Sequence, residues 1–297
     1  MPRVLRRVAL SGRFGQPRDD DDVWRTVTKG LLLMAIDVAI VLGVAIALFY
    51  ALSGYMISPV EHGFHCNDAS IRKPFYPNTV TTTELLTISL GSPFAIIFVC
   101  EAVLFWQGTG SHRVAKFFTS STFLILEYIL SYAACTFIME ILKCGVGRLR
   151  PHFIAVCDVD WSKVDCSTDP NAFITDVVCM NTADRRVRVS RTSFPSGHTA
   201  AAAFFCFWLI QYIRGISRAS GSRELNWMGR VLVVVVTGWT LFTAITRVTD
   251  NWHHPTDVLG GLILALLCIW PVFGRGRYSP DAVYERRDIF PPRVHFE

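Results

Sequence analysis

Six long apolar segments recur along this 297-residue chain, and they constrain its fold more than any other feature. About 20 apolar residues cross the hydrocarbon core of a bilayer, so three segments are long enough by themselves and three need their flanking residues. Only 18% of the residues are charged, which is low for a soluble domain. The chain is therefore predicted to be an all-α membrane protein with six transmembrane helices. The segments are Leu31–Leu52, Leu85–Trp106, Phe117–Leu142, Thr199–Ile213, Val231–Ile245 and Val258–Phe273.

The distribution of Lys and Arg between these segments sets the expected orientation. With an even number of spans, both termini lie on one side, and that side holds 18 of the 29 Lys and Arg residues. Basic residues are retained in the cytoplasm, so both termini are expected there. Residues 1–29 lack an apolar core and are expected to form a cytoplasmic tail, not a cleaved signal peptide. Residues 30–275 then form the six-span domain, and residues 276–297 form a second cytoplasmic tail.

Four of the nine cysteines fall in the two long loops on the opposite side of the membrane. That side is oxidising if the orientation is right, so at least one disulfide is expected. Four cysteines allow three pairings, and the simplest pair is Cys157–Cys166. The loop at residues 152–192 is long enough to form a folded lid over this face. The loop cysteines are Cys66, Cys157, Cys166 and Cys179.

Three clusters that carry Lys, Arg or His side chains lie where apolar segments meet loops on this same extracytoplasmic side. They are Lys143–Pro151, Ser193–His198 and Arg247–Asp257. Together they supply fixed positive charges, a Ser-Gly turn that opens a helix, two candidate catalytic histidines and a carboxylate. A phosphate ester under attack spreads negative charge over its oxygens, so fixed cations and aimed N–H groups stabilise it. The position between membrane spans indicates that the phosphate belongs to a lipid.

In the first cluster, Lys143 and Arg150 are seven residues apart at the end of the third span. Gly145 and Gly147 loosen the segment between them, so both cations can turn toward one point. Taken alone, the two are also typical of cations that snorkel at a membrane boundary.

In the second cluster, Ser196 and Gly197 open the fourth span. A Ser there is first an ordinary helix N-cap. The same geometry leaves backbone N–H groups and the positive end of the helix dipole free for an anion. His198 is then placed to give a proton to a leaving alkoxide.

In the third cluster, His253 lies six residues after Arg247 and four before Asp257. Pro255 fits the first turn of the sixth span. Asp257 is then expected to accept the imidazole N–H of His253 and to stabilise the cation that forms when the other nitrogen attacks phosphorus. The neighbouring His254 is expected to face another direction.

The joint pattern Lys-x6-Arg-Pro, Pro-Ser-Gly-His and Arg-x5-His-x3-Asp resembles the type 2 phosphatidic acid phosphatase superfamily. Within it, the chain is similar to the lipid phosphate phosphatases, in the motifs and in Tyr76-Pro77 and the runs 147–153 and 156–163. The resemblance covers about residues 30–275. Thr246 departs from the Ser that is usual before the motif Arg, although both carry a hydroxyl.

The resemblance implies a metal-independent, cofactor-free phosphatase with its active site at the extracytoplasmic ends of spans 3, 4 and 6. It implies that His253 is the nucleophile that forms a phosphohistidine, that Asp257 orients it, and that His198 is the acid. With the orientation set by the Lys and Arg residues, the expected location is the plasma membrane with the site outside, or an endomembrane with the site luminal. The residues that the resemblance assigns to phosphate binding are Lys143, Arg150, Ser196, Gly197, His198 and Arg247.

Other readings stay open at this point. They are a noncatalytic relative of the same fold, a phosphatase for polyprenyl diphosphate or sugar phosphate, a phosphotransferase and a transporter. Partners are expected to be lipid phosphates and the bilayer, without nucleic acid, and a homo-oligomer stays open. Among the acids within spans, Glu140 is expected to pair with Lys143 three residues later. Asp37, Glu101 and Glu127 are expected to make contacts between helices.

Overall fold

The computed structural model describes residues 35–36, 39, 43, 46, 50, 58–107, 113–164, 166, 169, 171–181, 184–220 and 222–273. Both predicted tails lie outside these residues. Of the first predicted span, Leu31–Leu52, only six scattered positions are described, and Asp37 lies outside the described residues.

Helices make up most of the described part of the chain. Local signals set several of their ends: Thr81 and Glu84 form a capping box at the start of α3, and Ser222 caps α9 by accepting from the Leu225 N–H. Gly147, with φ of +59°, follows the last residue of α5. The elements are β1 Phe64–His65, η1 Ala69–Ile71, α3 Thr82–Leu86, η2 Thr87–Gly91, α4 Ser92–Gln107, α5 Arg113–Val146, α6 Phe153–Cys157, β2 Phe173–Ile174, α7 Asp184–Ser190, α8 Gly197–Ser220, α9 Arg223–Thr249 and α10 Pro255–Phe273.

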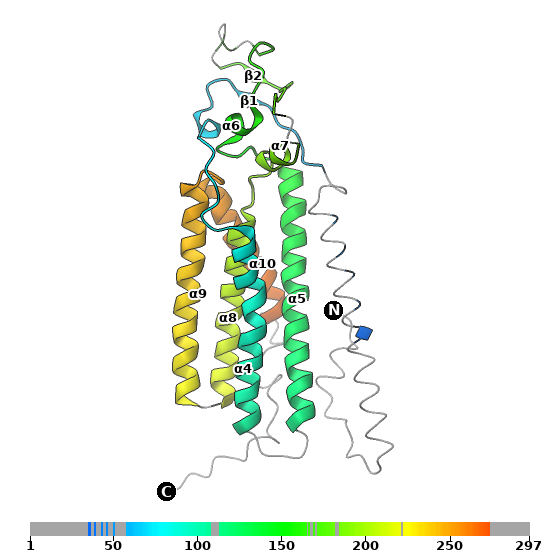
Figure 1. Ribbon diagram of the computed structural model, residues 1–297, viewed down its shortest axis with the longest axis vertical. Coiled ribbons are helices and arrows are strands. Elements are labelled where there is room, and N and C mark those ends of the chain that lie inside the picture. The colour runs from blue at the N-terminus through cyan, green and yellow to red at the C-terminus, as the bar shows by residue number, and fades with distance from the viewer. Residues whose placement is uncertain are drawn as a thin grey trace.

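Four helices in the described residues are long and apolar enough to cross a membrane. They coincide with the second to fifth predicted spans, and the sixth coincides with the shorter apolar helix Pro255–Trp270. Figure 1 shows α4, α5, α8 and α9 standing side by side as a bundle. The prediction of a helical membrane protein is therefore confirmed. The helices are Thr82–Trp106, Ser120–Val146, Gly197–Ser217 and Arg223–Thr249.

Helix α8 forms the centre of this bundle. It packs against α4, α5, α9 and α10, and the side chains of Phe204, Trp208 and Leu209 are at most 1% exposed. By contrast, α9 exposes Val234 and Ile245, which fits a surface that faces lipid acyl chains. The central position of α8 holds its first turn, which carries the second cluster, between the ends of the neighbouring helices.

A small folded lid caps one end of the bundle (Figure 1). Its own apolar core includes Phe64, Leu149, Phe153 and Val159, and β1 pairs antiparallel with β2. The predicted lid at residues 152–192 therefore folds, with α6, β2 and α7 in it. The segment before α3 contributes β1, a part that the sequence analysis did not assign to the lid.

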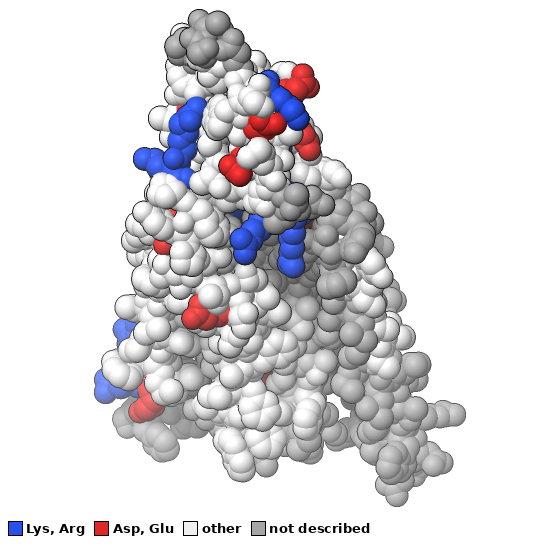
Figure 2. Space-filling view, turned by 45° about the horizontal axis from the view of Figure 1, so that its top comes forward, with Lys and Arg blue, Asp and Glu red and all other residues white. Residues whose placement is uncertain are grey.

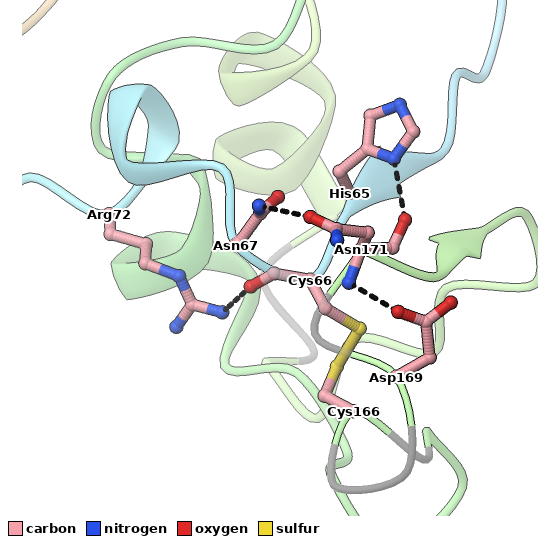
Figure 3. The surroundings of a disulfide bond; sticks show 7 residues. All are labelled: His65, Cys66, Asn67, Arg72, Cys166, Asp169 and Asn171. Atoms are coloured by element: carbon pink, nitrogen blue, oxygen red, sulfur yellow. Dashed lines mark hydrogen bonds between the residues drawn. A yellow bond between two sulfur atoms is a disulfide. The ribbon is translucent and has the colours of Figure 1, made fainter.

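Two disulfides join the parts of this lid. Cys66 pairs with Cys166, and Cys157 pairs with Cys179. At least one disulfide was correctly predicted, but the specific pair Cys157–Cys166 is wrong. The reason is the strand pairing: the backbone N–H of Cys66 donates to Ala172, which brings the end of β1 beside Cys166 (Figure 3).

Candidate active site

The three predicted clusters meet at one end of the bundle, under the lid. The C-terminal end of α5 and the first turns of α8 and α10 all lie there (Figure 1). Backbone hydrogen bonds join the clusters: Ser196 N donates to Asp257 O at 2.9 Å, and Ser193 N donates to Arg148 O at 2.8 Å. Residues from three distant parts of the sequence therefore surround one small region.

His253 lies in the turn between α9 and α10 and is only 3% exposed. Its Nδ1 is 2.7 Å from the carbonyl oxygen of Ser193. A carbonyl oxygen only accepts, so Nδ1 carries the proton and Nε2 keeps its lone pair. The sequence analysis expected Asp257 to accept this N–H, but Asp257 Oδ2 is 3.8 Å from Nδ1. The Ser193 carbonyl therefore fixes the tautomer, and Asp257 acts on the ring through its nearby charge.

The Asp257 carboxylate is completely buried and is held by three donors. Arg148 donates to Oδ1 at 2.6 Å, while the Ser193 hydroxyl and the His254 backbone N–H donate to Oδ2 at 2.6 and 2.8 Å. A buried carboxylate needs such partners, because burying a bare charge is costly. Arg148 was not among the predicted site residues. It lies inside the first cluster, but no local signal aims it at a carboxylate 109 residues away.

The cations of the first cluster are also fixed in place. Arg150 donates to the carbonyl oxygens of Val189 and Thr192, and its guanidinium lies 5.0 Å from the centre of the Trp252 ring. The predicted pair of Lys143 and Glu140 is confirmed, with Nζ and Oε2 3.6 Å apart.

The Lys143 ammonium reaches the second cluster. A methyl group added to Gly197 would lie 3.1 Å from Lys143 Nζ. Helix α8 begins at Gly197, as predicted, so this cation lies against its first turn. The absence of a side chain at Gly197 is what allows the approach.

Two buried nitrogen atoms in this region have no hydrogen-bond partner among the described residues, Arg247 Nε and His198 Nε2. Arg247 is 1% exposed, and its terminal nitrogens are already used by Asn78 Oδ1 at 2.6 Å and the Val80 carbonyl at 3.3 Å. Buried polar groups are normally hydrogen-bonded, and an unpaired charged donor is the most costly exception. The unpaired Arg247 Nε–H and the unpaired His198 nitrogen lie among the cations Lys143 and Arg150, an arrangement that can contact an anion such as phosphate.

Burial and neighbouring charge set the protonation of the groups outside the spans. Burial, together with the positive charge of Arg150, lowers the pKa of His253 to about 3. The imidazole is therefore neutral at pH 7, as a nucleophile must be. Burial also lowers the pKa of Arg150, to about 10, which leaves its charge intact at neutral pH.

Most charged side chains on one face of the molecule lie on or just below the lid, while the helical body beneath them is largely uncharged (Figure 2). Among the described residues, no group of three or more His, Cys, Asp and Glu side chains is arranged to hold a metal ion. The cations near His198 include Lys143, Arg150 and Arg247.

Comparison with known proteins gives the family. Residues 124–279, about half of the chain, match the PAP2 superfamily. The chain belongs to the PAP2 superfamily. This confirms the resemblance seen in the motifs and identifies the protein as a phosphatase that is integral to a membrane.

Several curated relatives are similar over most of the chain. Bos taurus phospholipid phosphatase 2 is 30% identical over 74% of this chain and 75% of its own length. Rattus norvegicus phospholipid phosphatase 1 is 30% identical over 69% and 72%, respectively. A Drosophila melanogaster protein provisionally named phosphatidate phosphatase is 31% identical over 79% of this chain, which spans 65% of that relative. No solved structure matches the chain.

Proposed function

We propose that this protein hydrolyses phosphate monoesters of lipids, such as phosphatidate, lysophosphatidate, sphingosine 1-phosphate and ceramide 1-phosphate. The observation that carries the proposal is the buried site in which Arg247 Nε and His198 Nε2 have no hydrogen-bond partner in the described part of the chain, while His253 presents an unprotonated nitrogen. The names of the phospholipid phosphatase relatives support a lipid substrate.

In the proposed mechanism, His253 Nε2 attacks the phosphorus atom, and an N–P bond forms as the bond to the lipid oxygen breaks. The phosphohistidine ring then carries a positive charge, which the buried Asp257 carboxylate stabilises at short range. His198 gives its proton to the departing alkoxide and afterwards takes a proton from the water that attacks the phosphohistidine. Breaking the N–P bond releases inorganic phosphate and restores His253.

The phosphate oxygens are bound by Lys143, Arg150, Arg247 and the first turn of α8 at Ser196 and Gly197. These cations supply the charge that a metal ion supplies in many phosphoryl-transfer enzymes. We therefore propose that turnover needs no metal.

We further propose six spans within residues 30–275, both tails in the cytoplasm, and the site on the extracytoplasmic face of the plasma membrane or of an endomembrane. The two disulfides support this orientation, because disulfides persist in oxidising compartments. This orientation is tested by labelling a cysteine introduced into the lid of the protein. The label is applied to intact cells, or to sealed vesicles in which the lumenal face of the membrane is outside. Labelling that requires permeabilisation would overturn the proposed orientation.

The substrate class is tested with purified protein in detergent, using the four lipids above with a chelator present. Turnover should persist in the chelator and be blocked by vanadate, whose trigonal-bipyramidal form mimics phosphorus under attack. Preference for a polyprenyl diphosphate or a sugar phosphate would replace the lipid monoester proposal. Loss of activity in the chelator, restored by magnesium, would overturn metal independence.

Substrates with different leaving groups distinguish the roles of His253 and His198. His253→Ala removes the attacking atom, so no phosphoenzyme should form with any substrate. In the first step, His198→Ala removes the proton donor, worth about 10²–10⁴-fold for an alcohol leaving group. Nitrophenolate leaves nitrophenyl phosphate without needing a proton, so this ester should restore phosphoenzyme formation in His198→Ala and not in His253→Ala. Labelled phosphate trapped on another residue would contradict the assignment of the nucleophile.

A further inference from the structure

An irregular segment before α3, Pro74–Val80, contacts the turn that carries the proposed nucleophile; we call it the strap. Asn251 donates from Nδ2 to the Pro74 carbonyl at 3.0 Å, and Trp252 donates from Nε1 to the Tyr76 carbonyl at 3.0 Å. Tyr76-Pro77, part of the family resemblance in the sequence, lies in this strap. These contacts fix the two residues immediately before His253.

The strap also contacts the end of α9 through Asp250. Thr79 donates its backbone N–H to Asp250 Oδ2 and its hydroxyl to Oδ1, both at 2.8 Å. The same Oδ2 accepts from Arg247 at 3.3 Å. Thr79 thus reaches Arg247 through a shared carboxylate.

Two further bonds tie Arg247 to the strap directly. Asn78 Oδ1 accepts from one terminal nitrogen at 2.6 Å, and the Val80 carbonyl accepts from the other at 3.3 Å. Both terminal nitrogens of the guanidinium are engaged in this way, while Nε has no partner among the described residues. The strap therefore determines which edge of the guanidinium is left for a ligand.

We infer that the strap is a positioning element for Arg247: Asn78 and Thr79 hold the guanidinium so that its Nε–H points at the substrate phosphate. An Arg side chain has several rotatable bonds, and fixing them before the substrate arrives removes an entropy cost from binding. A donor fixed in advance also stabilises the transition state without reorganisation. This inference rests on the proposed role of Arg247 as a phosphate ligand.

The experiment compares Asn78→Ala with a matched control in the same outer segment. Asn67→Ala also removes a 2.6 Å side-chain hydrogen bond, to Asn171, but that bond lies in the lid beside the Cys66–Cys166 disulfide (Figure 3). Asn78→Ala should lower kcat/KM and weaken vanadate inhibition by about tenfold to a hundredfold, the range for a hydrogen bond to a charged group. Asn67→Ala should leave both within about twofold. Thr79→Val, which keeps the backbone N–H and loses the hydroxyl, should show a smaller loss of the same kind.

A double-mutant cycle separates positioning from general stability. Arg247→Lys removes the groups that the strap holds, so adding Asn78→Ala to it should cause no further loss of vanadate affinity. Additive losses, or an Asn78→Ala variant that behaves like the control, would overturn the inference. Vanadate affinity is also measured as protection against thermal unfolding, which needs no turnover. If the wild-type protein binds vanadate through Arg247 but hydrolyses no lipid, the proposed function is wrong. The role of the strap can then still be tested by vanadate binding.

Discussion

Replacing Asp257 with Asn removes one buried negative charge while nearly preserving shape. In the structure this charge is 3.8 Å from His253 Nδ1. When the ring becomes positive during attack, Coulomb attraction at that distance is worth about 4 kcal/mol at an effective dielectric of about 20. Phosphoenzyme formation should therefore slow by about a thousandfold.

A change of tautomer would be a different cause, expected if Asp257 accepted the Nδ1 proton of His253. The structure argues against that cause, because the Ser193 carbonyl accepts the Nδ1 proton and is unaffected by the substitution. An Asn oxygen in the place of Oδ2 would still accept from the Ser193 hydroxyl and the His254 N–H. Its amide nitrogen would then face Arg148, which is partly exposed and can turn to water. The fold should lose only about 1–3 kcal/mol of stability.

Rapid-quench measurement of labelled phosphoenzyme tests this reasoning, because it isolates the first chemical step. Ser193→Ala is the matched control: it removes a donor to Asp257 but keeps the charge and the carbonyl, so it should slow the step by about tenfold at most. If phosphoenzyme formation in Asp257→Asn stays within about tenfold of the wild-type rate, a catalytic role for the charge is refuted.

Three further predictions follow from burial and cross-links. Because the pKa of His253 is lowered to about 3, its protonation should not reduce kcat/KM as the pH falls from about 8 to about 5. Arg150→Gln should raise the pKa of His253, so the loss of kcat/KM at low pH should begin at a higher pH in this variant. If that pH does not change, after correction for substrate ionisation, the assignment is contradicted. Replacing both Cys157 and Cys179 with Ser opens a link across 22 residues and should cost about 3 kcal/mol of lid stability, measured by protease resistance under non-reducing conditions. Glu140→Gln leaves Lys143 without its buried partner and should cost about 3–5 kcal/mol, seen as a lower unfolding temperature in detergent; an unchanged midpoint would contradict this.

Local patterns in the sequence were enough to predict the long helices and where two of them begin. Apolar runs predicted the second to fifth spans, and the residues Gly197 and Pro255 predicted where α8 and α10 begin. These features depend on hydrophobicity and backbone preference within a few residues, so they can be read without the fold. The pairing of Glu140 with Lys143 belongs to the same class, since a helix brings residues three apart onto one face.

The contacts that set the chemistry of the site were decided by tertiary packing. Ser193 and His253 are 60 residues apart, and Asn78 and Arg247 are 169 apart. A single carbonyl or amide leaves no pattern in the sequence, because every residue has a backbone acceptor and only the packed helices and lid choose which one lies beside the ring. The sequence alone therefore predicted which residues are candidates to act on a phosphate, while the tertiary structure decided which nitrogen of His253 carries the proton and which nitrogen of Arg247 has no partner among the described residues.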